Sequence, residues 1–144
     1  MPARAGELES SFMPSANDHH LFTVLVVEDE SLIRMDITAR LKQAGFSVFE
    51  AESADAAIQI LETRSDIHLV FTDIDMPGSM DGLKLAAYVR DRWPPIKLIV
   101  TSGHVALEES LLPTGGRFFP KPYELEAISS AIVELIAAEA NFLR

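Results

Sequence analysis

Five short runs of apolar, β-prone residues recur along the chain, and segments with helical spacing separate them. Runs that are apolar without polar alternation are typical of strands buried on both faces of a parallel sheet. The alternation of such strands with helices predicts an α/β fold with helices on both sides of the sheet. The expected strands are Thr23–Val27, Ser47–Ala51, Leu69–Thr72, Lys97–Thr101 and Arg117–Phe119.

Five helices are expected to connect and follow these strands. Ser31 is placed to cap the first helix, which Gly45 ends, and Asp81 is placed to cap the third. Right-handed crossovers leave few topologies, and they favour a flavodoxin-like, doubly wound five-stranded parallel sheet of order 2-1-3-4-5. The remaining expected helices are Ala54–Thr63, Gly82–Arg92, Val105–Leu112 (closed by Pro113) and Glu124 to about Ala140.

The composition limits the classes of function. The chain has 144 residues, of which 48% are hydrophobic, so we expect one compact domain over residues 21–144 behind a flexible tail of residues 1–20. The absence of cysteine excludes disulfides and thiolate metal sites. A net charge of −10 argues against nucleic acid as a direct partner. No apolar stretch approaches the roughly 20 residues of a membrane span, so we expect a soluble, cytoplasmic protein.

Charged and hydroxyl side chains follow four of the expected strands at the point where each strand ends. Glu28 and Asp29 follow the first strand, and Asp73 follows the third. Thr101 ends the fourth strand, and Lys121 follows the fifth. In the order 2-1-3-4-5 these four strands are neighbours, and their carboxyl ends meet where open α/β sheets bind ligands. We therefore expect these side chains to share one pocket.

Carboxylates this close require a counter-charge, because each pair repels by about 4 kcal/mol at ~4 Å in an effective dielectric near 20. Oxygen ligands without cysteine or organised histidine favour Mg²⁺. A carboxylate beside Mg²⁺ can act as a nucleophile and accept a phosphoryl group. Asp73 is the expected phosphoacceptor, with Lys121 offsetting the phosphoryl charge and Thr101 donating a hydrogen bond. Taken singly, each of these residues also has an ordinary structural explanation, such as acids at a helix N-terminus.

Four sequence segments together resemble the receiver domain of two-component response regulators, over roughly residues 21–140. The resemblance implies that a sensor histidine kinase or phosphotransfer protein phosphorylates Asp73. It also implies that Glu28, Asp29, Asp73 and the backbone carbonyl of Asp75 bind Mg²⁺. The segments that carry it are Val26–Glu30, Thr72–Pro77 with Met80–Gly82, Val100–Ser102 and Phe119–Pro122.

The resemblance further implies a switch in which the hydroxyl of Thr101 shifts and an aromatic side chain rotates. Phe118 occupies the aromatic position, three residues before Lys121. Phenylalanine lacks a hydroxyl, so any signal that it carries is steric, and ordinary core packing explains it equally well. The Lys121–Pro122 bond is commonly cis in the family.

Three features depart from the family pattern. Ser79 adds one residue to the loop after Asp73, and Pro113 interrupts the fourth helix of the usual output face. Asp75 places an acid at a variable position that is associated with the lifetime of the phosphoryl group. None of these features removes a required group.

Several functions stay open at this point. The leading hypothesis is a stand-alone receiver without enzymatic turnover, which signals to an unidentified protein target or acts in a phosphorelay, as a monomer or a homodimer. One alternative is a haloacid-dehalogenase-like phosphatase that uses Asp73 and Asp75, although that motif normally follows the first strand of a longer chain. The other is a receiver that acts by binding alone, without phosphorylation.

Overall fold

The computed structural model describes residues 22–78, 80–103, 112–113 and 115–142. Five parallel strands form one sheet in the order β2-β1-β3-β4-β5, which confirms the predicted topology. In chain order the elements are β1 (Thr23–Val27), α2 (Ser31–Gln43), β2 (Ser47–Ala51), α3 (Ala54–Thr63), β3 (Leu69–Asp73), α4 (Gly82–Arg92), β4 (Lys97–Ser102), β5 (Arg117–Pro120) and α5 (Leu125–Phe142).

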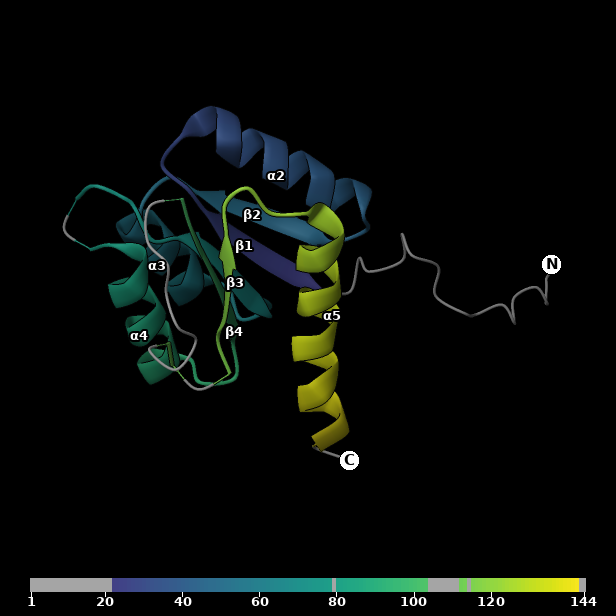
Figure 1. Ribbon diagram of the computed structural model, residues 1–144. Coiled ribbons are helices and arrows are strands. Elements are labelled where there is room, and N and C mark those ends of the chain that lie inside the picture. Colours follow the sequence, from purple (N-terminus) through teal and green to yellow (C-terminus); the bar gives the residue numbers. More distant parts are fainter. Residues whose placement is uncertain (1–21, 79, 104–111, 114, 143–144) are drawn as a thin grey trace.

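Helices cover both faces of the sheet, with α2 and α5 on one face and α3 and α4 on the other (Figure 1). Successive side chains of β1 alternate between the two layers, because neighbouring residues of a strand point to opposite faces. Leu25 and Val27 pack into the α3–α4 core, whereas Val24 and Val26 pack into the α2–α5 core. This two-sided burial explains why the central strands are continuously apolar in the sequence.

The register of the central strands sets the functional edge. Val27 of β1 pairs with Thr72 of β3, so Glu28 and Asp73 each occupy the next position along their strands. Asp73 pairs in turn with Thr101 of β4. The carboxyl ends of three adjacent strands therefore meet at one point, as the strand order predicted.

The described residues contain four helices, whereas the sequence predicted five. The difference falls on the expected helix Val105–Leu112, because residues 104–111 lie outside the described part of the chain. Ser79 also lies outside it. The strands β3, β4 and β5 each extend one residue further than expected, and α5 runs from Leu125 to Phe142. Among the described helices, none has both the length and the apolar character needed to cross a bilayer.

The predicted cap of α2 is wrong. Glu30 is the N-cap residue and makes no side-chain capping bond, so Ser31 already lies inside the helix. The N–H of Glu30 donates to Oε2 of Glu28 (3.1 Å). This bond holds Glu30 at the N-cap position, so the helix begins one residue earlier than predicted. The cap of α4 is confirmed, since Oδ1 of Asp81 accepts from the N–H of Lys84 at 2.9 Å.

Gly82 lets the first turn of α4 approach the end of β3 closely. Its N–H donates to the carbonyl oxygen of Ile74 (3.1 Å), and a Cβ built on Gly82 would overlap the carbonyl oxygen of Asp73. The neighbouring atoms are backbone atoms, which cannot move aside cheaply. The position of Asp73 therefore depends on a glycine nine residues further along the chain.

Replacing Gly82 with alanine is expected to destabilise the protein by about 2 kcal/mol or more, because an overpacked contact with backbone must be relieved by moving β3 or α4. Thermal unfolding followed by circular dichroism measures the loss. Gly103→Ala is the matched control, since among the described residues a Cβ there would meet Lys121 side-chain carbons at an ordinary contact distance of 3.8 Å. Equal melting temperatures for the two variants would contradict the close approach.

Candidate functional site

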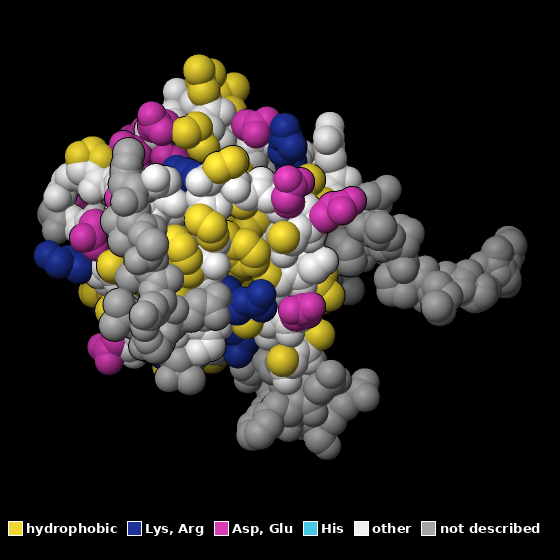
Figure 2. Space-filling view, in the orientation of Figure 1, with side chains coloured by type: hydrophobic (Ala, Val, Ile, Leu, Met, Phe, Trp, Pro, Cys, Tyr) yellow, Lys and Arg dark blue, Asp and Glu magenta, His cyan; other side chains and the backbone are white. Residues whose placement is uncertain are grey.

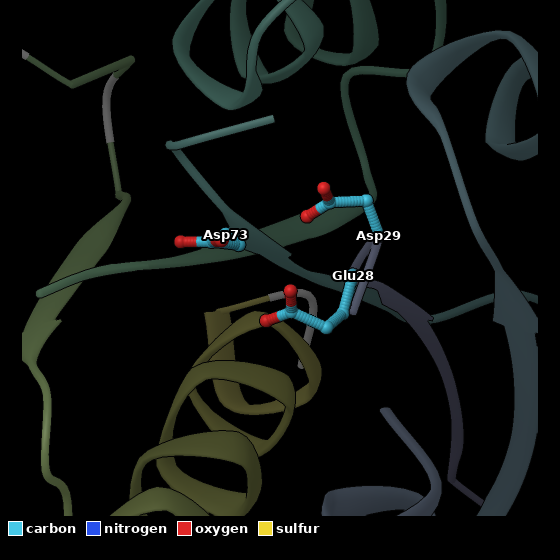
Figure 3. Close-up of side chains that lie close together, drawn as sticks. All are labelled: Glu28, Asp29 and Asp73. Atoms are coloured by element: carbon cyan, nitrogen blue, oxygen red, sulfur yellow. The ribbon is translucent and has the colours of Figure 1, made fainter. Parts of the chain in front are cut away.

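Three acidic side chains converge at the carboxyl end of the sheet, as predicted. Glu28 and Asp29 follow β1, and Asp73 ends β3. One carboxylate oxygen from each lies within 4.8 Å of the other two. Figure 3 shows the side chains of Glu28 and Asp29 extending from the end of β1 toward the side on which Asp73 lies. Glu28 and Asp73 are buried, each with 4% of its surface exposed, whereas Asp29 is half-buried.

Lys121 follows β5 and contacts two of these acids at once. Its Nζ lies 3.3 Å from Oε1 of Glu28 and 3.4 Å from Oδ1 of Asp73. The contact with Asp73 is an ion pair without hydrogen-bond geometry, and Oδ1 of Asp73 is a buried oxygen that accepts no hydrogen bond in the described part of the chain. The peptide bond from Lys121 to Pro122 is cis, as the resemblance implied.

The charges of the cluster do not balance. Burial raises the pKa of Glu28 and of Asp73 above their ordinary values, although Lys121 acts in the opposite direction on both. Burial lowers the pKa of Lys121, but the charges of Glu28 and Asp73 outweigh it and raise that pKa overall. The two buried acids thus remain harder to ionise than free carboxyls even with the ammonium group beside them. A divalent cation would offset this excess of negative charge.

Thr101 and Phe118 lie on the two strands beyond Asp73. Thr101 is buried on β4, and its carbonyl oxygen accepts from the N–H of Ile74 at 2.8 Å. Phe118 pairs with Val100 and packs, partly buried, against the α3–α4 core. The register therefore places Thr101 opposite Asp73 on the neighbouring strand. It places the aromatic residue one strand further away.

Asp75 adds a fourth carboxylate at the rim of the site. It lies two residues after Asp73, and its side chain is exposed to solvent. Oδ2 of Asp75 accepts a hydrogen bond from Oγ of Ser102 at 2.8 Å. No motif assigned a role to Ser102, although its position directly after Thr101 at the strand end was a signal for it.

Arg34 is a second residue near the site that no sequence motif indicated. From the first turns of α2, its Nη1 donates to the carbonyl oxygen of Glu28 (2.7 Å), and its Nε pairs with Glu50 of β2 (3.3 Å). These contacts tie the end of β1 to the neighbouring strand and helix. They fix the backbone from which Glu28 and Asp29 project.

Asp73, Asp75 and Lys121 border an open pocket of about 330 Å³. Its volume suits a small charged group with several waters. A second pocket, of about 420 Å³, adjoins it and shares Ile33 and Lys121. The first pocket is lined by Asp29, Glu30, Ile33, Asp73, Asp75, Gly103 and Lys121.

Comparison with known proteins identifies the family. The model of the response regulator receiver domain matches residues 24–133, and the chain belongs to this family. It is 35% identical over 120 residues to the sensor kinase CckA of Brucella abortus (strain 2308), covering 79% of this chain and 12% of that protein. It is 30% identical over 120 residues to the response regulator protein FleR of Pseudomonas aeruginosa, covering 81% of this chain and 24% of that protein. The chain therefore spans less than a third of the length of these relatives.

Solved structures agree with this assignment. A response regulator receiver domain protein from Clostridium thermocellum superposes with a TM-score of 0.78 at 27% identity, covering 85% of this chain and 99% of that one. A response regulator receiver protein from Sinorhizobium medicae WSM419 gives a TM-score of 0.75 at 30% identity, covering 81% and 95%. Receiver domains are phosphoacceptor switches of two-component systems, and this is the class of the chain.

The raised pKa of Asp73 predicts the direction of a pH effect. The folded state binds this proton more tightly than the unfolded chain, so the fold gains stability as pH falls through the folded-state pKa. In EDTA, lowering the pH from about 7 toward the ordinary pKa of an aspartate should therefore raise the melting temperature of the wild type relative to that of Asp73→Asn. Asp91 is an exposed acid on α4, and the variant Asp91→Asn should show the same rise in melting temperature as the wild type. Parallel pH profiles for wild type and Asp73→Asn would contradict the assignment.

Proposed function

We propose that this receiver domain accepts a phosphoryl group on Asp73 in a Mg²⁺-dependent reaction. The observation that carries the proposal is the environment of Asp73. It is a buried carboxylate that lies 3.4 Å from an ammonium group and within 4.8 Å of two further carboxylates. A buried carboxylate with incomplete charge compensation is higher in free energy than a carboxylate in water. At the edge of a polar pocket, such a group is a good candidate for a nucleophile.

The donor set fits Mg²⁺, which prefers oxygen ligands and keeps several waters. The three clustered carboxylates supply such ligands, and Oδ1 of Asp73, which belongs to one of them, accepts no hydrogen bond among the described residues. Glu28, Asp29, Asp73 and the backbone carbonyl of Asp75 would hold the ion. When bound, Mg²⁺ would supply charge neutralisation at the phosphoryl oxygens.

The remaining steps use this chain's own side chains. A carboxylate oxygen of Asp73 attacks phosphorus, and the bond from phosphorus to the donor nitrogen breaks with its electron pair leaving on the donor. Lys121 is held within ion-pair distance of Asp73 and offsets the charge that arrives. Thr101, the register partner of Asp73, donates its hydroxyl to a phosphoryl oxygen. Phosphorylation adds about −1.5 to −2 charges, and the shift of Thr101 would be passed sterically to Phe118.

The phosphodonor is a sensor histidine kinase or a phosphotransfer protein. The likeness to a sensor kinase supports a place in a phosphorelay. So does the likeness, at 28% identity and a TM-score of 0.68, to the solved receiver domain from the hybrid histidine kinase CckA. The adjoining 420 Å³ groove between α2 and the start of α5 reaches Lys121 and offers room for a protein donor. Leu32 and Met35 of α2 are 80% and 59% exposed, as expected for a contact surface.

The output of this domain is a contact with another protein, or phosphoryl transfer back to a histidine. The net charge of −10 disfavours direct binding of nucleic acid. We place the receiver at residues 21–144, with residues 1–20 as a tail, in the cytoplasm. The family match favours this function over a phosphatase that turns over Asp73 and Asp75.

Incubation with acetyl phosphate and Mg²⁺ tests phosphorylation directly. Intact-mass spectrometry should show one phosphoryl adduct on the wild type, and none on Asp73→Asn or in EDTA. Continuous release of phosphate from a phosphomonoester such as p-nitrophenyl phosphate would favour the phosphatase. Failure to form any adduct in Mg²⁺ would favour a receiver that acts by binding alone.

Asp29→Asn tests the metal cluster. Removing one of three mutually repelling charges should raise the melting temperature in EDTA, while Mg²⁺ affinity, measured by calorimetry, falls by about tenfold or more. Glu30→Gln is the matched control, because it neutralises the next acid along the chain, which lies outside the carboxylate cluster. A lower melting temperature for Asp29→Asn in EDTA would show that the carboxylates do not repel one another as argued.

A further inference from the structure

Arg34 holds the chain on both sides of Asp29. Its Nη1 donates to the carbonyl oxygen of Glu28 at 2.7 Å, and its backbone N–H donates to the carbonyl oxygen of Glu30 at 2.9 Å. One residue of α2 therefore anchors the backbone directly before and directly after an acid of the carboxylate cluster. A shift of the chain at Asp29 would lengthen or break these bonds.

The guanidinium group of Arg34 is itself held in place. The side chain is 16% exposed, and its Nε pairs with Oε1 of Glu50 at 3.3 Å. Glu50 belongs to β2, where the register places it opposite Val26, two residues before Glu28. A hydrogen bond from a charged donor to a carbonyl is stronger than a neutral one, and the low exposure of this donor limits competition from water. Arg34 thus links β2 rigidly to the end of β1.

We propose that Arg34 is the positioning residue that makes the carboxylate cluster selective for Mg²⁺ over Ca²⁺. The proposal rests on the Mg²⁺ binding proposed above. Mg²⁺ takes oxygen ligands at about 2.0–2.1 Å in a nearly ideal octahedron, whereas Ca²⁺ takes about six to eight ligands at about 2.3–2.6 Å. Three carboxylates can serve the larger ion only by rearranging, for example by binding through both oxygens. A backbone that Arg34 holds fixed resists this rearrangement.

The charge of Arg34 alone predicts a different result. Removal of a positive charge near the cluster would tighten the binding of both ions by nearly the same factor, because Mg²⁺ and Ca²⁺ carry equal charge. A loss of stability would weaken the binding of both ions by one common factor, since only the folded fraction binds. The ratio of the Kd for Ca²⁺ to the Kd for Mg²⁺ therefore reports the geometry of the site.

Calorimetric titration of the metal-free protein with Mg²⁺ and, separately, with Ca²⁺ measures this ratio. The wild type should bind Mg²⁺ more tightly than Ca²⁺. Arg34→Ala should bind Mg²⁺ about tenfold more weakly, with a much smaller change for Ca²⁺, so that the ratio falls by about tenfold. Arg34→Lys restores the charge, but one ammonium group cannot replace two nitrogens directed at Glu28 and Glu50, and the ratio should recover only in part.

Two further variants test the path of the effect. Arg40→Ala removes an equal charge from α2 at an exposed position, where Arg40 pairs with Asp36, and should keep the wild-type ratio. Glu50→Gln removes the ion pair that holds Arg34 to β2, and it should lower the ratio by less than Arg34→Ala does. Circular dichroism in EDTA checks that each variant folds.

The inference is overturned if Arg34→Ala keeps the wild-type ratio, if it binds both ions more tightly, or if Arg40→Ala lowers the ratio equally. A wild type that binds Ca²⁺ at least as tightly as Mg²⁺ also overturns it. If Arg34→Ala does not fold, an unchanged ratio in both Arg34→Lys and Glu50→Gln overturns the inference. A wild type that binds neither ion overturns the proposed metal site as well, which distinguishes the two failures.

Discussion

Two buried carboxylates that share one ammonium group are the constraint on which the rest of the structure depends. Among the described residues that line the pocket, Lys121 is the only cation, and it contacts both Glu28 and Asp73. Burial still raises the pKa of each acid, so without a metal ion the ionised carboxylates of Glu28 and Asp73 destabilise the fold. The stability that offsets this repulsion comes from the continuous apolar strands beneath it, which are buried on both faces.

Much of this arrangement could be predicted because it depends on local patterns. Strand and helix positions follow from short apolar runs and helical spacing, and the strand order follows from handed crossovers. Once that order is given, residues at the ends of neighbouring strands must meet. For this reason the sequence placed Glu28, Asp73, Thr101 and Lys121 at one edge before any contact was known.

The contacts that orient these groups could not be predicted in the same way, since they depend on register and on side-chain conformation. Arg34 reaches Glu50 because β1 and β2 pair with Val26 opposite Glu50, a pairing that no motif in the chain encodes. Ser102 reaches Asp75, 27 residues earlier in the chain, because of the path of the segment between β3 and α4, which the sequence does not fix. The misassigned cap at Ser31 has a related origin, because the carboxylate of Glu28 bonds the turn and moves the start of the helix.

The geometry also separates the phosphoacceptor from the residue that would transmit the signal. Asp73 ends β3 and lines the pocket. Phe118 lies two strands away on β5 and packs against the α3–α4 core, and the chain reaches Lys121 three residues later. In the proposed mechanism, a change at Asp73 therefore has to cross β4 before it reaches Phe118. Lys121 offers a second connection, because its ion pairs join the end of β5 to the acids at the ends of β1 and β3.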